Sequence, residues 1–441
     1  MARIKMSRQD KFTLVMLFFM TTILYADQLI INAIIPQLSA EYHVNESKVG
    51  MVGSAFIIVG VIMSLTFGYF ADKASRKALF IIAILVGEVP CVLTGIKYFT
   101  PDFTSFVAMR ILSGIGLGAI YPLSHSILSD YFKEDHRAAA SAWMGTAWSV
   151  GGLLGVNIAG FFTNAEWNTL GWRLSFIIIG VPNIPVALLF WAFAREPERG
   201  RTEDALEELI RDGKVYKQTI GLKDFKTIFT NKTNIFTLIQ GIPGTIPWGV
   251  LTFWFIAYFE AYRKLSKESA TLMFDVLGGG TLVGTIVFAY IGERLYRKDP
   301  KYMPILCGTG IIFGIIPSAI LINMPNSNMT LYMILGFLTG FFVSVAGANY
   351  KAILMNVNKP ENRGSVFAVS NLTDNIGMGL GPLVGALLLP YGYQLMVNFA
   401  IVWWLPCGLL FLLVSKFIDK DRLALRAYLD EKARALQEGK E

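Results

Sequence analysis

Twelve long apolar stretches follow one another along this chain, and polar connections separate them. A run of about 20 apolar residues crosses the hydrocarbon core of a bilayer once as a helix. Lipid offers the backbone no hydrogen-bond partners, so a spanning segment is a helix or a barrel strand, and barrel strands alternate in polarity over about 10 residues. The sequence therefore predicts an all-α membrane protein with spans at 12–36, 48–71, 78–99, 103–131, 138–163, 170–194, 233–260, 267–291, 302–323, 329–356, 364–389 and 392–417.

The distribution of charge predicts how the chain lies in the membrane. Charged residues make up 16% of the sequence, and Lys and Arg gather in alternate connections, whereas the loop at 260–268 is a basic exception. Cytoplasmic loops carry an excess of Lys and Arg, so we expect both termini in the cytoplasm. The expected location of the chain is a prokaryotic plasma (inner) membrane. The same pattern accounts for the net charge of +7, so no nucleic-acid partner is expected.

One long polar segment, 195–232, divides the predicted spans into two groups of six. We expect an N-terminal bundle at 1–194, a cytoplasmic linker at 195–232, a C-terminal bundle at 233–418 and a cytoplasmic tail at 419–441. The linker residues 202–210 and the tail have the pattern of short amphipathic helices that cover a surface.

The two groups of spans also resemble each other in sequence. At an offset of 226 residues Arg137 aligns with Arg363, Gly151 with Gly377, and Gly155 with Gly381. The segment 67–77 aligns without a gap with 288–298. Related halves with a site at their interface are typical of secondary transporters. The sequence therefore predicts two six-helix bundles related by pseudo-symmetry.

A charged motif, Gly68-x-x-x-Asp72-Lys73-x-x-Arg76-Lys77, lies between the second and third predicted spans. Its residues resemble the signature loop of the major facilitator superfamily, and a degenerate copy follows the eighth span. A glycine there lets helices approach closely, and an acid among cations can form an ion-paired latch. We expect Asp72 and Arg76 to pair with the start of the span at 364–389 or with the Arg137 loop. The predicted latch comprises Gly68, Asp72, Lys73, Arg76, Lys77, Arg137, Glu293 and Arg363.

Within that superfamily the chain resembles the Spinster-like group. The resemblance rests on Tyr25-Ala26-Asp27, on Arg110 with the glycines that follow it, and on Arg195-Glu196-Pro197. Gln28 and Leu117 depart from the group's usual arginine and glutamate. The resemblance implies a central cavity lined by spans 1, 4, 7 and 10, alternating access without a cofactor, and a monomer in the lipid bilayer.

Ionisable residues within the first bundle's spans are candidates for coupling or substrate recognition. Asp27 and Arg110 lie at one predicted depth, roughly 10–14 Å below the outer boundary. They therefore form a functional pair or a structural one. His125 either relays protons or is held by a hydrogen bond to Tyr121 or Ser129.

The second bundle offers further candidates. Lys351 either binds an anionic substrate or pairs with Asp374, and Asp275 is a weaker candidate. Trp248 follows a stretch rich in glycine and proline that must kink its helix, so it forms a gate or a pocket wall, or faces lipid. The resemblance to the superfamily implies that the third span is peripheral, so we expect Glu88, beside a proline in that span, to be structural.

The sequence weighs against enzymes and ATP-driven pumps. It holds three cysteines and three histidines without metal-ligand spacing, no nucleophile cluster, and no phosphate-binding glycine loop. We therefore predict a secondary transporter of a small organic solute, coupled to a proton or another ion, with an anionic or amphiphilic substrate. A sugar or drug efflux carrier, and a non-transporting receptor or scaffold on this fold, are the alternatives.

Overall fold

A computed structural model describes residues 7–44, 46–164, 170–203, 228–325 and 328–437. Within these residues the regular secondary structure is helical and contains no strand. The all-α prediction is therefore confirmed. Most of the expected linker helix at 202–210 lies outside the described residues.

The helices group into two compact units. The first comprises Met1–Ile127 with Thr146–Glu198, and the second comprises Leu128–Gly145 with Arg199–Glu441, so α5 and α6 pass from one unit to the other. The first group of helices is α1 (Arg8–Tyr42), α2 (Glu46–Ala71), α3 (Arg76–Thr94), α4 (Phe103–Leu117), α5 (Ile120–Tyr131), α6 (Arg137–Asn164) and α7 (Arg173–Phe193). The second is α9 (Lys232–Ile239), α10 (Gly241–Ala257), α11 (Lys267–Lys298), α12 (Tyr302–Asn323), α13 (Met329–Val343), α14 (Ala346–Val357), α15 (Arg363–Leu388), α16 (Tyr393–Val402), α17 (Trp404–Val414) and α18 (Ile418–Gln437).

Eleven segments of the described chain are long and apolar enough to cross a membrane. They match eleven of the twelve predicted spans. The twelfth, 364–389, forms α15, a 26-residue helix whose first half carries Asn371, Asp374 and Asn375. These polar side chains lower the hydropathy of α15, whose 26 residues nevertheless equal the length of a spanning helix.

Glycines set the helix packing of the first unit. A Cβ added to Gly114 of α4 would lie 2.5 Å from the Phe56 carbonyl oxygen of α2. A Cβ on Gly155 of α6 would lie 2.2 Å from the Ala26 carbonyl oxygen of α1. Small residues allow such close approach of backbones, which is the usual way that helices associate in lipid.

The second unit has corresponding contacts, with glycines at the positions that the 226-residue offset predicts. Gly340 of α13, the equivalent of Gly114, packs against the Leu277 carbonyl of α11. Gly381 of α15, the equivalent of Gly155, packs against Gly249 of α10. The internal repeat therefore preserves the backbone contacts within each unit.

Two long spans are interrupted at equivalent points, which the sequence analysis did not foresee. The fourth span breaks at Gly118-Ala119, between α4 and α5, and the tenth breaks at Ser344-Val345, between α13 and α14. A third interruption falls at Gln240, between α9 and α10. It directly precedes the Gly241–Trp248 stretch, which is helical throughout as part of α10, so the predicted kink within that stretch stays a prediction.

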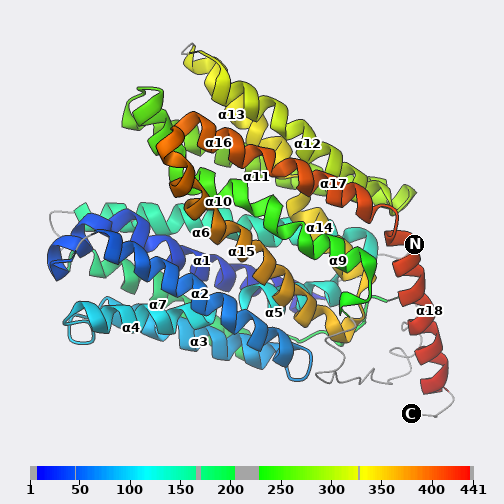
Figure 1. Cartoon of the computed structure of the whole chain (residues 1–441). Coiled ribbons are helices and arrows are strands. Elements are labelled where there is room, and N and C mark those ends of the chain that lie inside the picture. Colours follow the sequence, from blue (N-terminus) through cyan, green and yellow to red (C-terminus); the bar gives the residue numbers. More distant parts are fainter. Residues whose placement is uncertain (1–6, 45, 165–169, 204–227, 326–327, 438–441) are drawn as a thin grey trace. The chain divides into compact units, whose positions relative to one another are not determined.

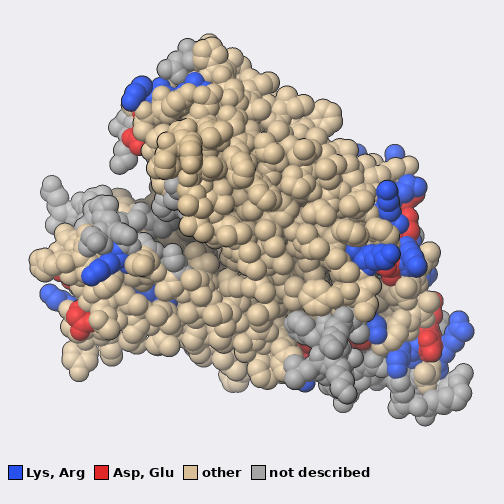
Figure 2. Space-filling model, viewed as in Figure 1, with Lys and Arg blue, Asp and Glu red and all other residues tan. Residues whose placement is uncertain are grey.

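Charge and apolar surface are separated along the helices. Figure 2 shows Lys, Arg, Asp and Glu near helix ends, while other residue types cover the helix sides on that face. Exposed apolar side chains include Ile62, Leu153 and Phe313, as expected for surface that faces lipid. The predicted tail helix is α18, which lies against α9 and α14 at the C-terminal end of the second unit (Figure 1).

Candidate functional site

The predicted pair between Asp27 and Arg110 is present in the first unit. Arg110 Nη1 lies 2.9 Å from Asp27 Oδ1, and the two side chains are 0% and 1% exposed. Two aromatic rings lie close to the guanidinium: Arg110 Cζ is 4.8 Å from the centroid of the Phe56 ring and 5.0 Å from that of the Phe176 ring. Nε and Nη2 of Arg110 have no hydrogen-bond acceptor among the described residues. Arg110 therefore keeps unused donors beside a single carboxylate.

The glycine contacts hold this pair in place. Asp27 directly follows Ala26, whose carbonyl touches Gly155 of α6. Arg110 lies one turn before Gly114, which touches Phe56 of α2. The backbone on both sides of the ion pair is therefore fixed by contacts that allow little side-chain volume.

A second carboxyl lies beside the pair, which the sequence analysis had assigned a structural role. Glu88 of α3 is 0% exposed, and its Oε1 accepts a hydrogen bond of 2.7 Å from Asn183 Nδ2 of α7. Cys91, one turn further along α3, donates through Sγ to Asp27 Oδ1 at 3.0 Å. The sequence signal for Glu88 was a carboxylate within an apolar run, which is the same feature that indicated Asp27.

The second unit holds a different polar cluster, on α14 and α15. Asp374 is partly exposed, and its Oδ2 accepts a hydrogen bond of 2.7 Å from the Tyr350 hydroxyl. Lys351 is 8% exposed, and its Nζ lies 5.9 Å from the centroid of the Tyr350 ring. Thr245 of α10 donates to the Asp374 carbonyl at 2.7 Å, which ties this point of α15 to α10. The structure therefore brings Asp374 and Lys351 into one region, with Tyr350 as an unforeseen member.

The other predicted candidates lie apart from these clusters. His125 is buried on α5, where Nδ1 lies 3.1 Å from the Tyr121 carbonyl and the ring stacks on Tyr121. Trp248 makes an edge contact with Trp404 at 6.1 Å. Asp275 is exposed on α11. Of these three, His125 makes the contact with Tyr121 that the sequence analysis named beside proton relay, and the choice between the two roles stays a prediction.

The motif loop of the first unit is anchored to the segment that follows α7. Arg76 is buried, and its Nε lies 3.2 Å from Glu196 Oε1. It also donates to the carbonyls of Ser126 and Pro197. Beside it, Asp72 and Gly68 are buried, Lys77 donates to the Ala194 carbonyl, and Lys73 contacts the hydroxyl of Tyr69.

A clasp of charged residues joins α6 and α15 within the second unit. Glu203 Oε1 accepts hydrogen bonds from Arg137 Nη2 at 2.6 Å and from Arg363 Nη2 at 2.5 Å. Each arginine also contacts a residue beside the other. Arg137 donates to Asn356 at 2.9 Å, and Arg363 lies 3.7 Å from Asp130, the residue equivalent to Asn356 in the internal repeat. Burial alone would raise the pKa of Glu203, but the two arginines outweigh it and lower the pKa to about 2. The linker thus supplies an acid that the sequence analysis did not select.

The degenerate motif copy contacts the start of α6. Glu293 Oε1 accepts a hydrogen bond of 3.0 Å from the backbone N–H of Ala139. Its Oε2 lies 3.5 Å from His136 and 3.8 Å from Arg297. A carboxylate on the first turn of a helix is favoured by the helix dipole.

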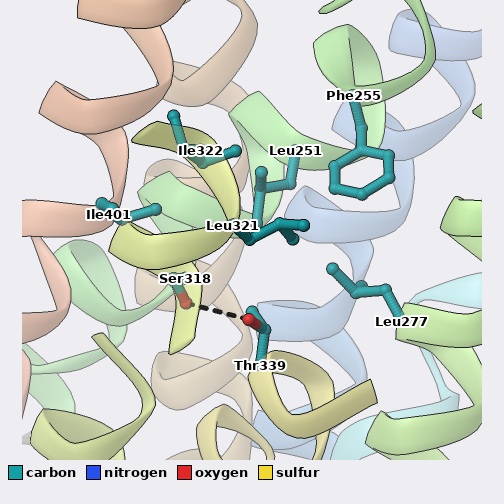
Figure 3. Close-up of a pocket in the computed structure, with 8 residues that line it drawn as sticks. All are labelled: Leu251, Phe255, Leu277, Ser318, Leu321, Ile322, Thr339 and Ile401. Carbon is teal, nitrogen blue, oxygen red and sulfur yellow. Dashed lines mark hydrogen bonds between the residues drawn. The ribbon is translucent and has the colours of Figure 1, made fainter. Parts of the chain in front are cut away.

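A small apolar pocket lies elsewhere in the second unit (Figure 3). Leu251, Phe255, Leu277 and Leu321 line it, with Ser318 and Thr339 joined by a hydrogen bond of 3.3 Å. It holds about 210 Å³ of empty space, including space open to solvent. Small-molecule sites usually measure about 300–1,000 Å³ and present polar groups to the ligand, so this pocket does not qualify as the substrate site. The described residues also contain no group of three or more His, Cys, Asp or Glu arranged for a metal.

Comparison with known proteins settles the family. The sequence matches the Major Facilitator Superfamily over residues 17–325 and 304–436. The chain belongs to this superfamily. It is 25% identical over 409 residues to the D-galactonate transporter of Escherichia coli O6:H1 (strain CFT073), covering 88% of this chain and 91% of that protein. Protein spinster homolog 1 of Xenopus tropicalis is 24% identical over 439 residues, covering 92% of this chain and 81% of that protein.

The solved structure of the proton:xylose symporter XylE bound to 6-bromo-6-deoxy-D-glucose has the same fold. It matches with a TM-score of 0.69 at 16% identity, over 93% of this chain and 95% of XylE. The predicted superfamily and its Spinster-like resemblance are therefore confirmed. This member of the Major Facilitator Superfamily is an integral membrane transporter and not an enzyme, in keeping with the D-galactonate transporter and the xylose symporter that it matches.

Proposed function

We propose that this transporter carries a small organic anion by alternating access, and that proton binding at Asp27 drives the cycle. The observation that carries the proposal is the buried ion pair between Asp27 and Arg110. Charges within membrane-spanning helices are costly and mark ion or substrate pathways. A pair that is sealed from solvent in one conformation is suited to detect a change of conformation.

Proton coupling follows from the electrostatics of the pair. While Arg110 lies 2.9 Å from Asp27, the cation stabilises the ionised carboxylate. A conformational change that separates the two leaves Asp27 buried without a cation, so the carboxyl binds a proton instead. Proton uptake thus accompanies the structural change itself, without a cofactor.

An anionic substrate is favoured by the second polar cluster. Lys351 supplies a cation, and Tyr350 supplies a hydroxyl donor that now serves Asp374. Asp374 is partly exposed, so a substrate that approaches this cluster meets polar groups without first breaking a buried ion pair. The D-galactonate transporter, a relative across most of the chain, is named for a sugar acid of this class.

The clasp at Glu203 is the proposed conformational latch. Glu203 holds Arg137 and Arg363, which are equivalent positions of the internal repeat, through one carboxylate oxygen. Opening at this end would have to break two charge-assisted hydrogen bonds at once. Arg76, Lys77 and Glu196 brace the motif loop in the same way within the first unit.

We also propose that both termini of the chain lie in the cytoplasm. The basic connections support cytoplasmic termini in a prokaryotic plasma membrane. The boundaries at 194, 232 and 418 are likewise proposed as the limits of the two functional bundles, the linker and the tail.

Flux into proteoliposomes tests the coupling. We expect uptake of labelled D-galactonate, or of another small organic anion from a panel, to rise when a proton gradient is imposed. Asp27→Asn should still fold and bind substrate but lose that response, because the amide cannot exchange a proton. Asp102→Asn is the matched control, since Asp102 is an exposed helix cap and Asn caps helices equally well. If Asp27→Asn keeps the pH dependence of the unaltered protein, Asp27 is not the coupling site, and His125 becomes the next candidate.

A further inference from the structure

The surroundings of the ion pair contain more carboxyls than cations. Asp27 from α1 and Glu88 from α3 are both buried, and Arg110 from α4 is the cation beside them. Glu88 also adjoins Cys91 on α3 and the neutral amide of Asn183 on α7. With both carboxyls ionised, the cluster would carry a net negative charge within the helix bundle.

The hydrogen bonds show which carboxyl is left without charge compensation. Asp27 has Arg110 at 2.9 Å and the Cys91 thiol at 3.0 Å. Glu88 has only neutral donors among the described residues: the Asn183 amide donates to Oε1, and the Cys91 thiol lies beside the carboxyl. A buried charge without a counter-charge is strongly disfavoured, so such a group takes up a proton.

The Asn183 amide fixes where that proton sits. Asn183 Nδ2 donates to Glu88 Oε1 and also to the Met20 carbonyl at 3.2 Å. A carbonyl oxygen can only accept, so the nitrogen must face both groups and Oε1 must be the acceptor. The free position for a proton is therefore Oε2. A Cβ added to Gly180 would lie 3.3 Å from Oε2 and 3.2 Å from Cys91 Sγ, so Oε2 and the thiol adjoin the same glycine.

We infer that Glu88 and Asp27 share one proton, and that Arg110 neutralises whichever of the two carboxyls is ionised. In the conformation described here the proton is on Glu88 and Asp27 is ionised. The unused donors of Arg110, Nε and Nη2, can serve a second carboxylate. Glu88 is thus a second proton-binding residue of the transporter rather than a packing residue.

The transfer between the two carboxyls keeps the cluster neutral. When Asp27 leaves Arg110, the O–H bond on Glu88 Oε2 breaks and an O–H bond forms on Asp27. The Glu88 carboxylate then takes the Arg110 cation. One proton and one positive charge are present before and after, so no further reactant is needed, and this exchange by itself takes up no proton from solution. The role of this exchange in coupling rests on the proposed function, whereas the shared proton does not.

Infrared spectroscopy of the purified protein tests the shared proton, since a protonated carboxyl has a C=O stretch distinct from that of a carboxylate. At neutral pH we expect a protonated-carboxyl band that Glu88→Gln removes. We also expect Asp27→Asn to remove it, because Arg110 is then free to stabilise ionised Glu88. The control Asp102→Asn should leave it unchanged.

The Asp27→Asn spectrum decides between the shared proton and a permanently neutral Glu88. A band that persists in Asp27→Asn would overturn the inference, since Glu88 would then hold its proton regardless of its neighbour. A band that survives Glu88→Gln would overturn it as well. Glu88→Gln keeps an oxygen for the Asn183 amide, and thermal unfolding in detergent verifies that each variant is folded.

Flux measurements separate this inference from the proposed function. If the band disappears in both variants but the unaltered protein shows no response to a proton gradient, the shared proton stands and proton-coupled transport fails. If transport is proton-coupled but Asp27→Asn keeps the band, the inference fails alone. If the shared proton and proton-coupled transport are both correct, Glu88→Gln should shift the pH profile of uptake.

Discussion

Asp27 and Asp374 are aspartates on spanning helices of the two units, yet their surroundings differ. Asp27 is sealed, with an arginine at 2.9 Å and a thiol at 3.0 Å. Asp374 is partly exposed and accepts a hydrogen bond from a tyrosine hydroxyl at 2.7 Å. An arginine compensates a full charge, whereas a hydroxyl solvates it. The first aspartate therefore suits proton exchange, and the second suits contact with a solute.

The helix contacts, by contrast, are the same in the two units. Gly155 and Gly381 touch the helix backbone beside them at equivalent points, as do Gly114 and Gly340. The fourth and tenth spans also break at equivalent residues. The internal repeat thus preserves the scaffold while the chemistry of each half diverges. This allows one unit to hold the coupling residues and the other to hold substrate contacts.

The largest effect is expected from removing the cation of the sealed site. Arg110→Gln leaves Asp27 buried without its partner, which costs about 3–5 kcal/mol for a broken buried pair. Lys351→Gln should cost less, because Asp374 is partly exposed and keeps its Tyr350 hydrogen bond. Chemical unfolding of both variants in one detergent measures the difference.

The double variant Asp27→Asn/Arg110→Gln is the control for this experiment. It should recover part of the loss, since no charge is then stranded. Equal losses for Arg110→Gln and Lys351→Gln would show that the two sites are electrostatically alike, contrary to the comparison.

A smaller effect, dependent on pH, is expected at the clasp. The pKa of Glu203 is about 2 in the folded protein and 4.5 in the reference state. The ionised carboxylate therefore contributes fully to the free energy of unfolding above pH 4.5, and this contribution is lost as the pH falls toward 2. A difference of this size corresponds to about 3 kcal/mol. Glu203→Gln should therefore lower the free energy of unfolding at pH 7 and have little effect near pH 2.

The neighbouring acid Glu198 provides the control for the clasp. It is exposed in the same segment, so Glu198→Gln should leave stability nearly unchanged at both pH values. A Glu203→Gln loss that is as large near pH 2 as at pH 7 would show that packing, and not charge, holds the clasp.

The sequence could predict the spans and the pairing of Asp27 with Arg110, because both follow from short-range regularities. Apolar runs define helices, and counting residues from a membrane boundary gives a depth. The repeat offset likewise located the equivalent glycines before their contacts were known.

The roles of Glu88 and Glu203 could not be predicted in this way. Glu88 acquires its surroundings from Asn183, 95 residues further along the chain. Glu203 contacts Arg363 across 160 residues. No local pattern encodes such contacts, so a buried acid in a peripheral span and an acid in a polar linker both resembled ordinary structural residues.

The smallest effects are expected from a test of the shared scaffold. Gly155→Val and Gly381→Val each place a side chain where a Cβ would lie 2.2 Å and 2.5 Å from backbone, and overpacking of this kind costs about 1–3 kcal/mol. Gly160→Val and Gly379→Val are matched controls on the same two helices, since a Cβ there meets nothing within 4 Å. We expect the first two variants to lose similar stability and the controls to lose only the small helix-propensity cost of valine.

The functional effects of these two glycine variants should nevertheless differ. Gly155 touches Ala26, next to Asp27, so its substitution moves the backbone of the proton site and should shift the pH dependence of uptake. Gly381 touches Gly249, next to Trp248 in the second unit, so its substitution should change the apparent affinity for substrate and leave the pH dependence in place. Uptake measured across pH and substrate concentration for both variants resolves the two outcomes. Identical changes in pH dependence would mean that proton exchange is not confined to the first unit, and the division of chemistry between the halves would then have to be abandoned while their structural equivalence remained.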